Sequence, residues 1–187
     1  MRIFTNQALS ASLNGYVYLD NDFLGHLYTL FLNSESDFFS LLSENFSNSL
    51  MMIDSLTKFE FLRDVFLKEE KELKETFVGN TKVFTPAIDS PITIKKVRDN
   101  ALIISLIYAN KNIKGVDIVD LHLVGRLLLN VDNSIIITGN KKHFPIFLFD
   151  TLDLINFEQD NGVTQTFYLL KVSTDKLDMR IIDLADV

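Results

Sequence analysis

Three acidic residues stand where predicted strands and helices meet, and their types suit one kind of chemistry. Asp20 follows a strand-like run, while Glu60 and Asp120 each lie in the first turn of a predicted helix. Three carboxylates gathered without Lys or Arg between them repel one another and titrate as a coupled set. A hard divalent cation such as Mg²⁺ or Mn²⁺ relieves that repulsion, and such ions support phosphodiester hydrolysis. These residues therefore predict a metal-dependent catalytic site.

Strands that alternate with helices are expected to position these acids. Three apolar runs lack polar alternation, as is typical of strands covered on both faces, and they span 16–19, 50–53 and 134–137. Helical spacing of apolar residues predicts helices over 23–32, 34–46, 57 to about 77, 92–110 and 117–128. This alternation implies parallel strands with right-handed crossovers, whose carboxyl ends share one crevice. The three acids are therefore expected to converge at that crevice.

The remaining segments predict an irregular loop and an antiparallel addition. Pro and Gly residues within 78–91 predict a loop. Residues 152–157 and 163–172 read as two strands around an Asn-Gly turn, and 180–184 reads as one more strand. The predicted fold is α/β, a three-layer α/β/α arrangement with a mainly parallel central sheet and an antiparallel C-terminal hairpin. We expect a nuclease-type domain over 1–150, with 151–187 packed on it as a β extension.

Composition narrows the classes of function. The chain has 187 residues, no Cys and three well-separated His, so disulfides and Cys-based metal or nucleophile chemistry are excluded. A net charge of −7 argues against a general nucleic-acid coat, but it leaves room for a local basic patch beside a metal. No apolar run approaches the ~20 residues that span a bilayer, and the N-terminus lacks a signal-peptide pattern. We therefore expect a soluble, cytoplasmic protein with no membrane partner.

Each acid also has a purely structural interpretation. Thr57 and Glu60 have the spacing of a capping box, which would stabilise a helix start by about 1 kcal/mol without any metal. Asp117 is expected as an N-cap with Asp120 as the third helical residue, and Asp20 could form an Asx turn. Taken alone, Glu60 is better explained as a cap. Only the combination of the three acids favours a shared site.

Four segments together resemble the PIN-domain ribonuclease family, which includes the VapC-type toxins of toxin–antitoxin pairs. The resemblance covers about Tyr16 to Asp150 and rests on Tyr16–Leu24, Ser55–Leu62, Asp120–Leu128 and Ile136–Phe144. It implies Asp20, Glu60 and Asp120 as catalytic, metal-binding acids. Thr138 and Asn140 are implied as polar accessories to these acids.

Two positions depart from the family's pattern. Asn140 stands where many members carry a fourth carboxylate, so a second metal would be held poorly. Asp22 stands where Asn or Ser is more usual and could partly replace that acid.

The loop after the strand at 134–137 is basic. Lys141, Lys142 and His143 are expected to contact the phosphates of a substrate, although each could instead be an exposed loop residue. His122 is expected to be a structural histidine beside the apolar stripe of its helix.

The resulting prediction is an Mg²⁺- or Mn²⁺-dependent endoribonuclease acting on single-stranded or loop RNA. The alternative is a catalytically weak or inactive PIN-like module that binds RNA or protein. A third interpretation, an α/β phosphohydrolase or response-regulator-like domain using Asp20 and Asp22, lacks a suitably placed Lys after a later strand. An antitoxin-like protein partner and a homodimer are further expectations of the family resemblance.

Overall fold

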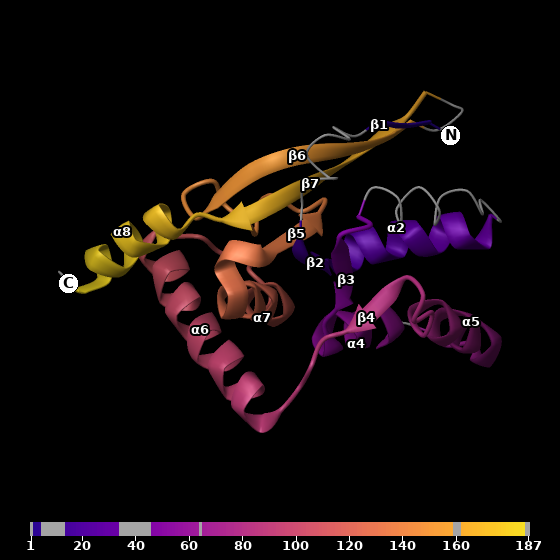
Figure 1. Ribbon diagram of the computed structural model, residues 1–187, viewed down its shortest axis with the longest axis horizontal. Helices are drawn as coiled ribbons and strands as arrows, with labels where there is room; N and C mark the ends of the chain where they lie inside the picture. Colours follow the sequence, from indigo (N-terminus) through magenta and orange to yellow (C-terminus); the bar gives the residue numbers. More distant parts are fainter. Residues whose placement is uncertain (1, 5–13, 34–45, 64, 159–161, 186–187) are drawn as a thin grey trace.

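The computed structural model describes residues 2–4, 14–33, 46–63, 65–158 and 162–185. Within them, seven strands form one sheet in the order β1-β6-β7-β5-β2-β3-β4 (Figure 1). The strands are β1 Arg2–Phe4, β2 Gly15–Leu19, β3 Ser49–Ile53, β4 Phe84–Pro86, β5 Ser134–Thr138, β6 Phe149–Glu158 and β7 Thr164–Val172. The helices are α2 Asn21–Leu32, α4 Ser55–Arg63, α5 Lys68–Val78, α6 Pro91–Asn110, α7 Ile118–Leu127 and α8 Thr174–Ala185, with a 3-10 segment, η1, at Leu128–Asn133.

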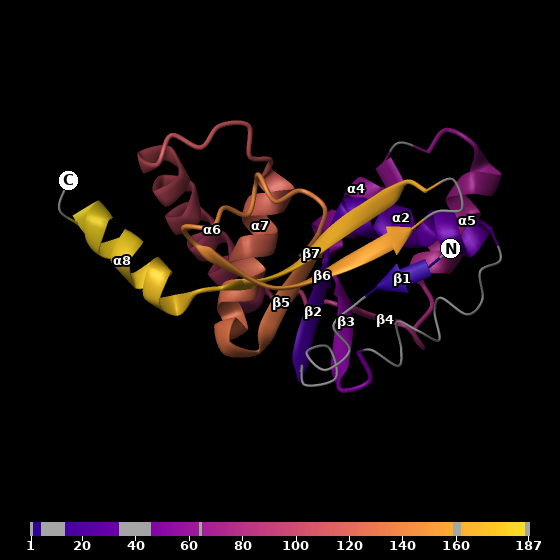
Figure 2. The same cartoon turned by 90° about the horizontal axis from the view of Figure 1, so that it is seen from above.

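The centre of the sheet is parallel and is buried on both faces. β2 pairs in parallel with β3 and β5, and β3 pairs in parallel with β4. Alternate side chains of β2 enter two different cores: Val17 and Leu19 pack with α2, α4 and α5, whereas Tyr18 packs with α6 and α7. Figure 2 shows these two groups of helices on opposite sides of the central strands. The predicted three-layer α/β/α arrangement is confirmed.

The C-terminal hairpin is antiparallel, as predicted. β7 pairs with β5, β6 pairs with β7, and β1 is added to β6, all antiparallel. Of the predicted Asn-Gly turn, residues 159–161 lie outside the described part of the chain. The prediction of a strand over 180–184 is wrong, because this segment belongs to α8. Leu177 and Leu184 are seven residues apart and so lie on one side of that helix. Both pack against the core that contains residues of α6 and α7.

Two predicted boundaries also change. The segment 78–91 contains the short edge strand β4, whose last residue, Pro86, suits a strand edge. The single helix predicted from 57 to about 77 is instead α4 and α5. This break lets Phe61 and Phe77 both contact the ring of Tyr28, at centroid distances of 5.5 and 5.4 Å. The helix predicted over 34–46 falls on residues that are not described, apart from Phe46.

No helix in the described residues is long and apolar enough to cross a membrane.

Helices α6 and α7 approach each other closely at Gly125. A Cβ atom at this position would overlap the carbonyl oxygen of Val97 and lie 3.2 Å from the amide nitrogen of Ala101. The amide of Asn100 donates to the carbonyl oxygen of Gly125 at 3.1 Å, which ties the two helices together at the same point. The contact requires Gly in the middle of a helix, despite its poor helix propensity.

We predict that Gly125→Ala lowers the free energy of unfolding. Overpacking costs about 1–3 kcal/mol and exceeds the gain of up to about 1 kcal/mol in helix propensity. Urea unfolding measures the change. Gly25→Ala in α2 is the matched control, because a Cβ there meets nothing within 4 Å and should be neutral or stabilising. Equal effects of the two substitutions would contradict the close approach.

Candidate functional site

An acidic cleft of about 180 Å³ lies beyond the carboxyl ends of β2 and β5. Its lining combines residues from the start of α2, from α4, from the start of α7 and from the loop after β5. These residues are Asp20, Asn21, Asp22, Glu60, Asp117, Val119, Asp120, Asn140 and His143. Lys and Arg are absent from this lining. The structure thus brings Asp20, Glu60 and Asp120 to one cleft, together with Asn140 and His143.

Helix caps position two of the acids. Asp20 is the N-cap of α2, where its Oδ1 accepts from the amide of Asn21 at 2.7 Å. Asp117 caps α7 and forms a reciprocal capping box with Asp120, as the sequence predicted. In both places the residue that begins a helix also faces the cleft.

The capping-box interpretation of Glu60 is wrong. Helix α4 already begins at Ser55, and Asp54 satisfies its first turn by accepting from the amide of Leu56 at 2.9 Å. Thr57 lies inside the helix, where its buried hydroxyl has no hydrogen-bond partner. Thr57 and Glu60 therefore do not form the predicted capping box. Glu60 lines the cleft, with a guanidinium nitrogen of Arg63 3.6 Å from its Oε1.

The end of β5 and the residue that follows it hold the two carboxylates at the start of α2. The buried hydroxyl of Thr138 donates to Oδ2 of Asp20 at 2.6 Å and accepts from the amide of Asn140 at 2.9 Å. The amide of Gly139 donates to Oδ2 of Asp22 at 2.8 Å. Thr138 therefore orients the carboxylate of Asp20 but does not line the cleft itself.

His143 holds the third carboxylate. Its Nδ1 lies 2.6 Å from Oδ2 of Asp120 and 2.8 Å from the side-chain amide of Asn140. The hydroxyl of Tyr108 donates to the carbonyl oxygen of His143 at 2.7 Å, which fixes the backbone of this loop. When Nδ1 carries the proton, it donates to Asp120 and supports the ionised carboxylate. His143 lines the cleft, so it is not the exposed loop residue that the sequence left as an alternative.

The acids raise one another's pKa values. Burial raises the pKa of Asp20 to about 7, and the charges of Asp22 and Asp120 add to the shift. Burial also raises the pKa values of Asp22 and Asp120, although the nearby His143 opposes the shift at Asp120. Such a cluster is costly to ionise in a folded protein. Clusters of this kind occur preferentially at functional sites.

The donor set suits a hard divalent cation, but the side chains do not yet enclose one. In the part of the chain that the structure describes, no three His, Cys, Asp or Glu side chains are arranged to hold one metal ion. One oxygen of each of Asp20, Asp22 and Asp120 is engaged by Thr138, Gly139 or His143.

The two predicted substrate lysines lie outside the cleft. The Nζ atom of Lys141 lies 4.8 Å from the ring centroid of Tyr168, which is a cation–π contact. Lys142 is exposed to solvent. Both lysines belong to the loop that also carries Asn140 and His143. Asn140 and His143 line the cleft, but the two lysines do not.

Sequence reasoning missed a buried ion pair of Asp54 and Arg126, to which the more exposed Asp89 adds a second carboxylate; Arg126 is 2% exposed. His122, predicted to be structural, lies beside it with Nε2 3.3 Å from Oδ1 of Asp54. The only signal in the sequence was an Arg within a helix of buried apolar residues. Its partners are 72 and 37 positions away along the chain, so no local pattern identifies them.

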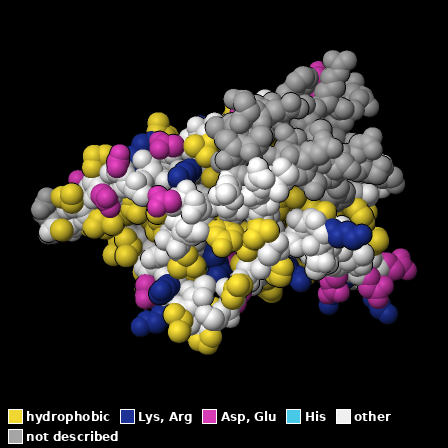
Figure 3. Space-filling view, viewed as in Figure 1, with side chains coloured by type: hydrophobic (Ala, Val, Ile, Leu, Met, Phe, Trp, Pro, Cys, Tyr) yellow, Lys and Arg dark blue, Asp and Glu magenta, His cyan; other side chains and the backbone are white. Residues whose placement is uncertain are grey.

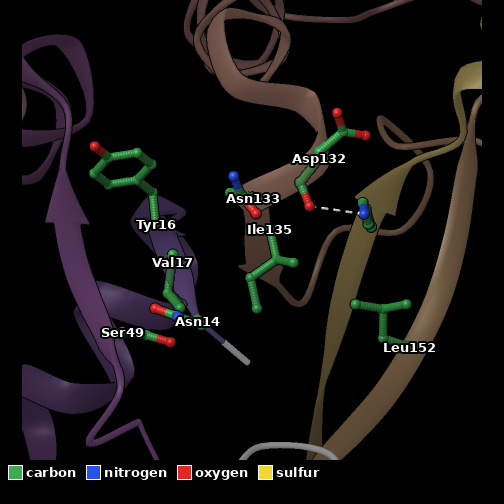
Figure 4. A pocket seen from close by; sticks show the side chains of 10 residues that line it. Asn14, Tyr16, Val17, Ser49, Asp132, Asn133, Ile135 and Leu152 are labelled. Carbon is green, nitrogen blue, oxygen red and sulfur yellow. Dashed lines mark hydrogen bonds between the residues drawn. The ribbon is translucent and has the colours of Figure 1, made fainter. Parts of the chain in front are cut away.

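A larger cavity of about 380 Å³ lies at the opposite edge of the sheet (Figure 4). The first residues of β2 and β3 line it, together with residues that precede and begin β5. Its one cation, Lys171, donates to the carbonyl oxygen of Asp132 at 2.8 Å. This cavity lacks a group of converging carboxylates, so the smaller acidic cleft is the better candidate for chemistry.

No protein-family model matches this chain, and neither a curated protein nor a solved structure matches it. The resemblance to PIN-domain ribonucleases therefore stays a prediction that rests on four sequence motifs.

Proposed function

We propose that the protein is a divalent-metal-dependent endoribonuclease of the PIN-like type, acting on single-stranded or loop RNA. The observation that supports this proposal is the convergence of acids from α2, α4 and α7 on one narrow cleft lined by no Lys or Arg. Burial and then the neighbouring charge of Asp22 raise the pKa of Asp20, so an ionised carboxylate is unfavourable at this position. A function that needs those carboxylates explains their presence better than stability does.

Asp20, Glu60 and Asp120 would hold Mg²⁺ or Mn²⁺, and Asp22 would take part of the role of the fourth acid. When bound, the ion supplies Lewis acidity, which activates a water molecule and neutralises charge on the phosphate. Thr138, Gly139 and His143 hold the carboxylates in place. Outer-shell partners of this kind orient metal ligands in other proteins.

Lys141 and Lys142 would contact phosphates of the RNA backbone outside the cleft. Single-stranded or loop RNA is favoured because its backbone and unstacked bases can enter a narrow site. An antitoxin-like protein partner and a homodimer remain predictions of the family resemblance.

We predict that purified protein cleaves a labelled single-stranded RNA with Mn²⁺, and that EDTA stops the reaction. Asp120→Asn should lower the rate by more than about 100-fold, because removing a direct ligand costs more than the 10–100-fold typical of outer-shell changes. Asp150→Asn is the matched control, since Asp150 pairs with Lys176 at the surface, away from the cleft. Equal rates for the two variants would refute the proposal.

The second candidate is a non-catalytic PIN-like module that binds RNA or protein. Two observations favour it: Asn140 replaces the fourth acid, and no three described side chains already enclose an ion. A folded wild-type protein that neither cleaves several RNAs nor binds millimolar Mn²⁺ would support this alternative.

A further inference from the structure

A buried ion cluster connects the two helices that carry Glu60 and Asp120. Asp54 lies between β3 and α4 and is 0% exposed, and Arg126 lies in α7. Oδ2 of Asp54 accepts from Nε of Arg126 at 2.9 Å and lies 2.7 Å from its Nη2. Burial raises the pKa of Asp54, but His122 and Arg126 together lower it by more. The pKa of Asp54 therefore lies below its ordinary value. Asp54 is therefore ionised beside a charged guanidinium.

The carboxylate of Asp54 accepts hydrogen bonds from both α4 and α7. Its Oδ1 accepts from the amide of Leu56, and its backbone carbonyl accepts from the amide of Lys58 at 2.8 Å. These bonds hold the first turn of α4, while Oδ2 holds Arg126 of α7. Since both oxygens belong to one small, rigid group, the start of α4 cannot turn or slide without moving Arg126.

Arg126 is itself fixed from the side of α6. Its Nη2 lies 2.5 Å from Oδ1 of Asp89, and its Nη1 donates to the carbonyl oxygen of Ile88 at 3.1 Å. Both partners belong to the segment that leads into α6. The preceding residue, Gly125, is packed directly against α6. Arg126 therefore has little freedom, and Asp54 is held against a fixed point.

The spacing along both helices relates this cluster to the acidic cleft. Glu60 follows Asp54 by six residues, and Asp120 precedes Arg126 by six residues. Each interval corresponds to a rise of about 9 Å along a helix axis. Asp54 binds Arg126 at one point, and Glu60 and Asp120 line the same cleft. A shift of α4 relative to α7 therefore changes the position of Glu60 relative to Asp120.

We propose that Asp54 and Arg126 are positioning residues that set the register of α4 against α7, and thereby the separation of Glu60 from Asp120 across the cleft. This inference deepens the proposed function, on which its consequence for metal binding rests. Stability alone does not explain the cluster, because apolar residues often replace buried ion pairs without loss of stability. Register is a better explanation, since charged and hydrogen-bonded groups impose a single geometry where apolar packing allows several.

The absence of Cys from the chain permits a direct test. Lys58→Cys on α4 and Ile118→Cys on α7 place two spin labels on exposed positions, and electron paramagnetic resonance gives the distribution of distances between them. Asp54→Asn in this background keeps an oxygen that can cap α4 but removes the charge that binds Arg126. We expect the distribution to broaden or shift. An unchanged distribution would overturn the proposal.

Mn²⁺ affinity, measured by calorimetry, tests the consequence for the site. Asp54→Asn is expected to weaken Mn²⁺ binding by up to about 10-fold, the lower end of the effect of losing a direct outer-shell partner, because Asp54 acts on the ligands only through the position of α4. Phe157→Leu, in the core on the α2 side, controls for a general loss of stability and should retain wild-type affinity. A changed distance with unchanged affinity would overturn the link to the site. If the wild type binds no Mn²⁺, the proposed function fails. The distribution of spin-label distances then tests by itself whether Asp54 sets the position of α4 against α7.

Discussion

Asp20→Asn is expected to stabilise the fold while abolishing cleavage. Asp20 is almost fully buried, and burial together with the charges of Asp22 and Asp120 raises its pKa from 3.8 to about 7. The ionised carboxylate is therefore unfavourable in the folded protein. An Asn side chain carries no charge, and its one oxygen can accept the hydrogen bond from Thr138 or the cap hydrogen bond from the amide of Asn21, but not both. It cannot, however, replace a carboxylate that binds a divalent ion.

The pH dependence follows from the direction of this shift. A raised folded-state pKa favours the protonated acid, so its contribution to stability is complete below the unfolded pKa of 3.8. This contribution is lost as pH rises to about 7. The shift corresponds to at most about 4 kcal/mol. Without metal, the wild type should lose stability across this window relative to Asp20→Asn.

Urea unfolding between pH 4 and 8 in EDTA measures the difference between the two proteins. Adding Mn²⁺ should then stabilise the wild type and leave the variant unchanged, because a ligand stabilises only the state that binds it. A variant less stable than the wild type at pH 8 would show that the fold favours the charged Asp20. Retained RNA cleavage by Asp20→Asn would remove this residue from the catalytic site.

Arg126→Met is expected to cause the largest loss of stability. The substitution removes the guanidinium that Asp54 and Asp89 share, and it leaves the fully buried Asp54 without that cation. Breaking a buried ion pair in this way costs about 3–5 kcal/mol. Met has a similar length and no charge, so the loss reports mainly the unpaired carboxylates. Chemical denaturation at pH 7 measures the change in the free energy of unfolding.

A second substitution separates charge from packing. In Asp54→Asn/Arg126→Met, the buried negative charge at position 54 is absent, so much of the lost stability should return. The non-additivity of the two substitutions gives their coupling energy. Arg126→Met alone could instead lower the free energy of unfolding by less than about 1 kcal/mol, which is the range of exposed ion pairs. That result would contradict a buried pair of Asp54 and Arg126.

Local patterns in the sequence predicted the centre of the fold. The apolar runs at 16–19, 50–53 and 134–137 form β2, β3 and β5, because strands buried on both faces need apolar side chains at every position. Asp117 was recognised as a helix cap for a similar local reason. The predicted meeting of Asp20 and Asp120 required only one general rule, that parallel strands end at the same edge of a sheet.

Contacts between distant segments decided the rest. β4 is three residues long and exists as a strand through its pairing with β3, and α8 packs against a core that α6 and α7 share with the strands. The partners of Asp120 and Asp54 also come from distant segments: His143 lies 23 residues beyond Asp120, and Arg126 lies 72 residues beyond Asp54. The sequence alone determined which segments are strands and where acids stand. The tertiary structure decided which polar groups pair, because pairing depends on the close packing of helices that local periodicity does not encode.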